Sequence, residues 1–378
     1  MSRSTGWFSE AAFLRLVRGE SRSPGARLAR VGLRMAAAGY GLAVAVRNAR
    51  YDRGSSAIQG VTVPVIAVGN LTLGGTGKTP MVEWVARWYR ARGIRVAILS
   101  RGYGQDDGIN DEGRVLEENL PDVPHLQGAD RVRLAEVAVE EIESEVLVLD
   151  DGFQHRRLKR DLDIVLLDAL EPFGLGWLFP RGLLREPVRS LRRAGVVVLS
   201  RADLVPESTR ASIRAEAERR AGPLRWVEAR HAPLDLLDAD GPPTPIASLA
   251  GRSVAAFCGI GNPDGFRKTI EPLVGNFVGF RTWPDHHSYT AADVADLTAW
   301  VRGLKADLVL TTQKDLVKLR ASNLGAVPLR ALRIGLEIMS GQAILDEALA
   351  PFGPPGTREP RHDEDESPRS RESRPSEA

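Results

Sequence analysis

Short apolar runs, rich in β-branched residues, recur along the middle of the chain. They lie at Val65–Val68, Val96–Leu99, Val146–Leu149, Ile164–Leu167 and Val196–Leu199. Near-continuous runs of this kind are typical of strands that are buried on both faces of a sheet. Helical stretches are expected between the runs, near 80–92, 129–143 and 208–221. The alternation predicts an α/β fold, in which a mostly parallel sheet is flanked by helices.

A second α/β set follows along the chain. Strands are expected at Val254–Phe257, Asn276–Phe280 and Leu308–Leu310, and helices near 264–272 and 291–303. The stretch 231–247 between the two sets is rich in proline, aspartate and glycine, which indicates a domain boundary or an insertion near residue 230. We therefore expect a core over 61–230 and a second, smaller α/β domain over 231–350. The segment 351–378 has almost no apolar residues and is expected to be disordered.

The N-terminal segment, 1–60, has a different pattern. The residues between Arg34 and Arg47 carry no charge, but at 1.5 Å per residue this run spans only about 18 Å of the roughly 30 Å hydrocarbon core of a bilayer. On a helix, Arg27, Arg30 and Arg34 share one face, and a neighbouring face carries Leu28, Val31, Met35, Leu42 and Val46. The pattern predicts a helix that lies in the membrane interface, with its arginines toward anionic headgroups. A helix that packs on the protein's own core fits the same pattern.

Composition and charge sharpen this picture. With 378 residues, of which 43% are hydrophobic and 26% charged, the chain can bury the cores of two domains. Its net charge is only +2, yet residues 1–53 contain ten arginines and three acidic residues. This asymmetry indicates an anionic partner, either a membrane surface or nucleic acid. A nucleic-acid partner is not expected, because the basic segment lacks interleaved aromatic residues. The single cysteine, Cys258, excludes an internal disulfide and a thiolate metal cluster.

The strongest chemical signal is VPVIAVGNLTLGGTGKTP, in which a buried strand leads into a glycine-rich turn and then a helix. In a P-loop of this kind, backbone N–H groups and the positive end of the helix bind phosphate oxygens. Lys78 is expected to reach the β- and γ-phosphates of a nucleotide, and the Thr79 hydroxyl to ligate Mg²⁺. The first glycine of the usual pattern is replaced by Thr72. The predicted nucleotide-binding residues are Thr72, Leu73, Gly74, Gly75, Thr76, Gly77, Lys78 and Thr79.

The second signal is VLVLDDGFQH. Asp150 and Asp151 end an apolar run about 70 residues after the loop, where a P-loop protein places the acidic residue that supports Mg²⁺. Thr79, Asp150 and Asp151 are therefore the predicted metal ligands. Metal binding does not explain the residues that follow, Gly152–His155.

Three further features are weaker. Asp111 and Glu112 lie in a polar stretch that we expect to be a loop, where solvated carboxylates are the ordinary case. In FPRGLLRE, an arginine in a loop can neutralise phosphate, and an ordinary surface arginine fits equally well. In Asp285-His286-His287, a histidine beside an aspartate can transfer protons, and an exposed turn is the alternative.

Taken together, these segments resemble one family, the tetraacyldisaccharide 4′-kinases of lipid A biosynthesis. The resemblance covers roughly residues 60–320, and the family's loop also lacks a glycine at the position of Thr72. The segments occur in the family's order: GNLTLGGTGKTP (69–80), SRGYG (100–104), Asp111-Glu112, DDGFQH (150–155), FGLGWLFPRGLLRE (173–186), GIGNP (259–263), PDHHSY (284–289) and TQKD (312–315).

The resemblance implies a kinase that transfers the γ-phosphate of ATP, with Mg²⁺, to the 4′-hydroxyl of an acylated glucosamine disaccharide 1-phosphate. Such enzymes work at the cytoplasmic face of the bacterial inner membrane, and no protein partner is implied. The resemblance makes Asp111 the base that accepts the hydroxyl proton and His286 its partner. It also places Arg185 in a loop at the active site, so that Arg185 and the Lys78 of the glycine-rich loop complete the predicted catalytic residues. Further candidates at the site are Glu112, Gln154 and Glu186.

Two rival classes are weaker. Membrane-associated partitioning ATPases carry a lysine directly before their Gly-Gly-x-Gly-Lys-Thr, where this chain has Leu73. A GTP-dependent metallochaperone is favoured only by 200–203 (SRAD), which faintly resembles a guanine-reading loop, and the sequence lacks the Cys and His cluster that metal delivery requires. The alternative to a lipid kinase is thus a membrane-associated P-loop ATPase or GTPase switch.

Overall fold

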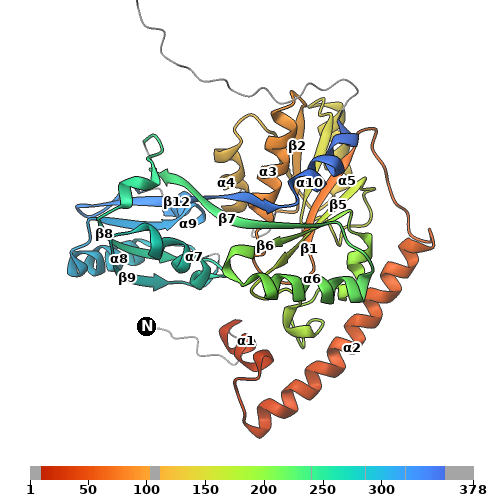
Figure 1. Cartoon of the computed structure of the whole chain (residues 1–378), viewed down its shortest axis with the longest axis horizontal. Coiled ribbons are helices and arrows are strands. Elements are labelled where there is room, and N and C mark those ends of the chain that lie inside the picture. Colours follow the sequence, from red (N-terminus) through yellow and green to blue (C-terminus); the bar gives the residue numbers. More distant parts are fainter. Residues whose placement is uncertain (1–9, 103–110, 240, 286, 320, 354–378) are drawn as a thin grey trace, which may run out of the picture.

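The strands form one continuous sheet that runs through the whole molecule. The computed structural model describes residues 10–102, 111–239, 241–285, 287–319 and 321–353. The strand order is β3-β2-β4-β1-β5-β6-β7-β12-β10-β8-β9, with β11 beside β12 (Figure 1). The strands are β1 (Val65–Asn70), β2 (Val96–Ser100), β3 (His125–Gln127), β4 (Val146–Asp150), β5 (Leu162–Asp168), β6 (Val196–Ser200), β7 (Trp226–Leu237), β8 (Ser253–Cys258), β9 (Asn276–Thr282), β10 (Leu308–Thr312), β11 (Asn323–Leu324) and β12 (Val327–Ser340).

Helices cover both faces of this sheet. They are α1 (Glu10–Arg18), α2 (Pro24–Asp52), α3 (Lys78–Arg90), α4 (Asp111–Asn119), α5 (Arg131–Glu140), α6 (Glu207–Ala221), α7 (Pro263–Ile270), α8 (Ala291–Leu304), α9 (Gln313–Leu319) and α10 (Gln342–Leu349). Short 3-10 turns lie at Gly174–Gly176, Val188–Arg193, Ala202–Leu204, Ile246–Leu249, Glu271–Leu273 and Ala350–Phe352.

The first half of the sheet has the pattern of a parallel sheet buried on both faces. Every residue of β1, β2, β4 and β6 is buried. From β2 through β4, β1, β5 and β6 to β7, each strand is parallel to the next. The side chains of α3 and α10 pack on one face, and those of α5 and α6 pack on the other. The predicted α/β fold with an N-terminal helix is therefore confirmed.

Two long strands connect the two halves. β7 and β12 are antiparallel, with Leu336 opposite His231, and they cross the molecule side by side (Figure 1). The predicted boundary near residue 230 falls inside β7, in a stretch for which no strand was expected. After β12 the chain returns to the first half, where Asp346 of α10 accepts a 2.7 Å hydrogen bond from the Trp88 indole. The division at 230 stays a prediction, and most of the predicted tail lies outside the described residues.

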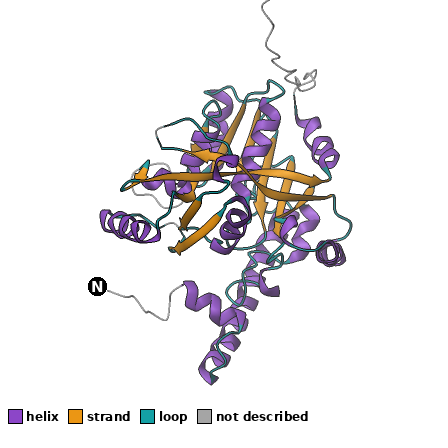
Figure 2. Ribbon diagram, turned by 60° about the vertical axis from the view of Figure 1, so that its left-hand side comes forward, coloured by secondary structure: helices purple, strands orange, loops and turns teal. Residues whose placement is uncertain are grey.

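α2 is longer than the apolar run that predicted it. Ser23 caps it, accepting a 3.2 Å hydrogen bond from the Ala26 N–H, and the helix runs along the outside of the molecule (Figures 1 and 2). Only Ala37 and Val44 of this helix are buried. In the described part of the chain, no helix combines the length and apolarity needed to cross a membrane. The exposed apolar side chains of α2 are Leu28, Val31, Met35, Leu42 and Val46, each at least 50% exposed.

Candidate active site

The glycine-rich loop lies at the carboxyl end of β1 and is held by hydrogen bonds to its backbone and to Thr76. The Asn70 amide donates to the Thr76 hydroxyl at 2.9 Å, and the Ser200 hydroxyl donates to the Thr76 carbonyl at 2.8 Å. The Arg201 guanidinium donates to the Gly75 carbonyl at 2.8 Å. Ser200 ends β6 and Arg201 follows it, while Asn70 ends β1. The loop is therefore held by residues at the carboxyl ends of two parallel strands.

The start of the loop explains why Thr72 stands in place of a glycine. Thr72 pairs with Leu184 in an isolated antiparallel bridge, and the Leu73 N–H donates to the Leu183 carbonyl at 2.8 Å. Thr72 is 5% exposed, and the part of the loop that lines the neighbouring cavity begins only at Gly74. The structure thus places Thr72 and Leu73 in a short strand-like contact at the entrance to the loop, where a side chain is tolerated.

Lys78, Asp151 and Arg185 form the charged centre of the site. Arg185 donates to both carboxylate oxygens of Asp151, at 2.9 and 2.7 Å, and the Lys78 Nζ lies 3.5 Å from Asp151 Oδ1. Burial acts to raise the pKa of Asp151, but the two cations outweigh it and hold that pKa below its usual value. Asp151 is therefore an anion that orients Lys78 and Arg185, both of which were predicted as catalytic residues.

Thr79 and Asp150 lie beside this centre. Thr79 is in the first turn of α3, Asp150 is the last residue of β4, and both are buried and line the same cavity as Asp151. A hydroxyl and two carboxylates supply hard oxygen ligands, the type that Mg²⁺ prefers. The residues present therefore fit the predicted metal.

A cavity of about 590 Å³ joins these residues to the second half of the molecule. Its volume is within the range of ordinary small-molecule sites. It is lined from the first half by Gly74–Pro80, Glu83, Ser100–Gly102, Gly113, Val115, Leu116, Asn119, His125, Asp150, Asp151, Arg185, Arg201, Asp203, Leu204 and His231, and from the second half by Ile260–Asn262, Gly265, Phe266, Thr269, Asp285, Thr312–Lys314, Leu332 and Ile334.

Asp111 and Glu112 were expected in a loop, and that expectation is wrong. They open α4, which forms because Val115 and Leu116 are buried, at 7% and 1% exposure. α4 forms one wall of the cavity through Gly113 and the residues after it. The side chains of Asp111 and Glu112 lie outside the described structure, and so does His286.

The residues after the two aspartates have structural roles. Phe153 is fully buried against Gly69, where an added Cβ would lie 2.6 Å from the Phe153 Cβ. The Gln154 amide donates to the Asn70 carbonyl at 2.9 Å, directly before the loop. His155 is 3.0 Å from Arg131. Gln154, a candidate of the sequence analysis, thus supports the loop from behind.

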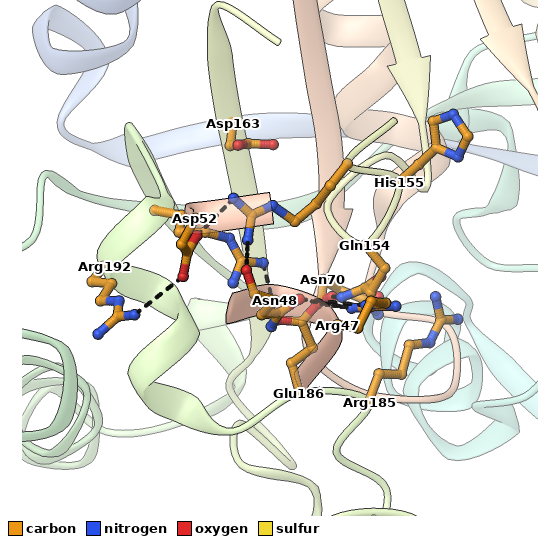
Figure 3. Close-up of polar contacts among 12 residues, drawn as sticks. Arg47, Asn48, Asp52, Asn70, Gln154, His155, Asp163, Arg185, Glu186 and Arg192 are labelled. Atoms are coloured by element: carbon orange, nitrogen blue, oxygen red, sulfur yellow. Dashed lines mark hydrogen bonds and ion pairs between the residues drawn. The ribbon is translucent and has the colours of Figure 1, made fainter. Parts of the chain in front are cut away.

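Glu186 anchors α2 to the active-site loop. Its fully buried carboxylate accepts hydrogen bonds from Arg47 at 2.7 Å and Asn48 at 2.9 Å (Figure 3). It also accepts one from Arg193 at 3.0 Å. The Tyr40 hydroxyl, also on α2, donates to the Arg185 carbonyl at 2.9 Å. α2 therefore contacts both the main chain of Arg185 and the residue that follows it.

Sequence reasoning missed three residues that the fold brings to the cavity. Arg201 binds the loop and also pairs with Asp168. His231 of β7 lies against the loop, because an added Cβ at Gly77 would be 2.5 Å from its Nε2. His125 of β3 is 2.9 Å from the Ser100 hydroxyl. Arg201 had a signal, since it directly follows a buried run as Asp151 does, whereas His231 had none, because β7 was not foreseen.

Two of the partly buried histidines, those that line the cavity, predict that the fold is sensitive to acid. Burial, with Arg201 adding to it, lowers the pKa of His231 to about 3, and burial lowers the pKa of His125 to about 4. Unfolded histidine titrates near pH 6.5, so the unfolded chain binds more protons and stability falls as the pH drops below that value. We expect the free energy of unfolding in urea to fall by about 2 kcal/mol per imidazole between pH 6.5 and 5. A His231→Asn variant should show a flatter slope, and an unchanged slope would contradict the assignment.

Comparison with known proteins identifies a family. The family model for tetraacyldisaccharide-1-P 4′-kinase matches residues 29–351. The chain is 42% identical to the tetraacyldisaccharide 4′-kinase of Anaeromyxobacter dehalogenans (strain 2CP-C), over 88% of this chain and 93% of that protein. It is 37% identical to that of Geobacter sulfurreducens, over 89% and 98% of the two chains. Among solved structures it resembles "apo" form LpxK from Aquifex aeolicus in complex with ATP, with a TM-score of 0.67 and 29% identity, over 86% of this chain and 99% of that one. The chain therefore belongs to the tetraacyldisaccharide-1-P 4′-kinase family.

Proposed function

We propose that this protein transfers the γ-phosphate of ATP to the 4′-hydroxyl of a tetraacylated glucosamine disaccharide 1-phosphate, a step of lipid A biosynthesis. The observation that carries the proposal is the family match over residues 29–351. The related Aquifex structure contains ATP. The cavity adds a physical reason, because the glycine-rich loop lines it on one side and residues of the second half line it on the other.

The charged centre explains how the phosphate is handled. Phosphoryl transfer requires positioning and neutralisation of charge more than covalent chemistry. Lys78 and Arg185 are oriented by Asp151 at one end of the cavity, where both can donate hydrogen bonds to phosphate oxygens. Mg²⁺, when bound, neutralises charge on the β- and γ-phosphates. Thr79, Asp150 and Asp151 are the residues that would hold it.

The acceptor hydroxyl needs a base, and we assign that role to Asp111. The position of Asp111 in the chain supports this assignment, because it begins α4 two residues before Gly113, which lines the cavity. An alcohol is a weak nucleophile, and a positioned carboxylate that takes its proton speeds attack. His286, next to the cavity residue Asp285, is assigned as the group that supports Asp111. It belongs to the second half, so catalysis would require both halves.

The location proposed for the enzyme is the cytoplasmic face of the inner membrane, with α2 in the interface. The half-exposed apolar face of α2 supports this, because such a face is unfavourable in water and favourable among lipid headgroups. The same helix contacts the Arg185 loop. An acyl-chain acceptor held in the membrane would therefore meet the enzyme beside its active site.

The test is transfer itself. Purified protein is given ATP labelled at the γ-phosphate and the acylated disaccharide 1-phosphate in nonionic detergent micelles, and labelled lipid is separated from labelled phosphate. We expect label in the lipid at the 4′ position, dependent on the acceptor. Hydrolysis of ATP without labelled lipid would instead support the alternative, a membrane-associated nucleotide switch.

A further inference from the structure

Three arginines gather where α1, α2 and the loop before Arg185 meet. Arg30 and Arg181 donate to neighbouring carbonyls at the end of α1, those of Leu16 at 3.4 Å and Val17 at 2.9 Å. Arg181 and Arg34 both lie over the indole of Trp177, at 5.4 and 5.0 Å from its ring centre. The end of α1 and the Trp177 ring thus bring the guanidinium groups of Arg30, Arg34 and Arg181 together. We call these three residues the arginine cluster.

No described carboxylate neutralises the positive charge of the arginine cluster. Within the described ranges, none of the three guanidinium groups has a carboxylate at ion-pair distance. Many other arginines of the described chain do form ion pairs, among them Arg47, Arg185, Arg193 and Arg201. Partial burial, then Arg34 and Arg30, lower the pKa of Arg181. The Arg181 Nε is buried and has no hydrogen-bond partner there. Since each guanidinium has five N–H donors, an anion would relieve the repulsion and use donors that are left over.

The surroundings of the arginine cluster are apolar and exposed. Leu28 is 73% exposed, Met35 74% and Val31 50%, all on α2 beside Arg30 and Arg34. Trp177 and Phe179 are 42% and 39% exposed on the adjoining loop, and the Phe179 ring packs on Tyr40 of α2 at 6.0 Å. Charge next to exposed apolar surface is the arrangement that suits an anionic amphiphile.

The arginine cluster is also close to the active site along α2. Tyr40 donates to the Arg185 carbonyl, and Arg34 precedes Tyr40 by six residues, about 9 Å along a helix axis. The same loop carries Arg181 and Arg185. A lipid whose phosphate is bound at the cluster can therefore extend toward the charged centre.

We propose that Arg30, Arg34 and Arg181 form a binding site for the phosphate group of a lipid. This rests on the proposed function for one of its two sources, the 1-phosphate of the acceptor. The other source is the headgroup of an anionic bilayer lipid. In either case the guanidinium forks donate charge-assisted hydrogen bonds to the phosphate oxygens, while the apolar side chains of α2 accompany the acyl chains.

The first arm of the test is kinetic and uses nonionic micelles, which contain no other phosphate. The double variant Arg34→Ala/Arg181→Ala is compared with Arg50→Ala/Arg53→Ala, which removes two exposed arginines at the opposite end of α2. If the site binds the 1-phosphate, we expect the first variant to raise the KM for the acceptor about ten- to a hundredfold, with kcat and the KM for ATP within about twofold. With wild type, an acceptor that lacks the 1-phosphate should show a KM raised by the same factor. With the variant, removal of the 1-phosphate should raise the KM no further, as a double-mutant cycle requires.

The second arm measures sedimentation with vesicles and needs no turnover. If the site binds a bilayer headgroup, the cluster variant should lose binding to vesicles of phosphatidylglycerol and phosphatidylcholine, keep its weak binding to pure phosphatidylcholine, and show unchanged kinetics in micelles. Arg34→Lys/Arg181→Lys should restore part of either effect, because the charge remains, and thermal unfolding checks that each variant is folded. A cluster variant that matches the Arg50/Arg53 control in both arms would overturn the proposal. If wild type does not phosphorylate the lipid, the proposed function is overturned, and the vesicle measurement still tests the arginine cluster.

Discussion

Replacing Lys78 by alanine is expected to lower kcat for lipid phosphorylation by about a thousandfold. Lys78 begins α3, and its Nζ points to the charged centre, 3.5 Å from Asp151 Oδ1. An ammonium group so placed is preorganised to meet negative charge as it moves between phosphate oxygens. Its loss removes donors that water cannot replace with the same geometry.

The effect of Lys78→Ala should be confined to turnover. Asp151 keeps its two hydrogen bonds to Arg185. The free energy of unfolding of the variant should therefore lie within about 1 kcal/mol of that of wild type. Lys159→Ala provides a control, because Lys159 is an exposed lysine whose Nζ also lies near a carboxylate, 3.9 Å from Asp161 Oδ1. Lys159 does not line the cavity. Steady-state kinetics with labelled ATP measures both variants. Turnover by Lys78→Ala at the rate of the Lys159 variant would remove Lys78 from the mechanism.

The sequence was most informative where one local pattern determines one element. The apolar runs of β1, β2, β4, β5 and β6 need no knowledge of their neighbours, because a strand buried on both faces is apolar throughout. The glycine-rich loop was likewise local, and Lys78 and Asp151 meet because β1 and β4 are parallel neighbours that end at the same edge. Arg185 required the family resemblance, since nothing in its own segment distinguishes it from a surface arginine.

The sequence was least informative where partners far away in the chain decide the structure. β7 contains proline and aspartate, which weaken a strand, yet it is stabilised by pairing along its length with β12, about a hundred residues later. His231 reaches the loop only through that pairing. α4 was hidden by its charged residues, because the apolar positions that bury it, Val115 and Leu116, are few. Such features depend on tertiary contacts, which local propensity does not include.

Glu186→Ala should have the largest effect on stability and should also impair catalysis. The Glu186 carboxylate is fully buried between Arg47, Asn48 and Arg193, so its removal leaves cations without their partner. Breaking a buried pair in this way costs about 3–5 kcal/mol. Because the same contact joins α2 to the residue after Arg185, we also expect kcat to fall by about a hundredfold through displacement of that arginine.

Asp52→Asn is the matched control for Glu186→Ala. Asp52 also joins α2 to the core, through Arg192 at 3.8 Å (Figure 3) and through Arg156 at 2.8 Å, but its side chain is 41% exposed. Exposed pairs contribute less than about 1 kcal/mol, so this variant should keep both stability and kcat. Urea unfolding and steady-state turnover separate the two. Equal losses of stability and kcat in both variants would mean that any contact between α2 and the core has this effect. Losses confined to Glu186→Ala would show that the buried contact next to Arg185 is the one that supports the active site.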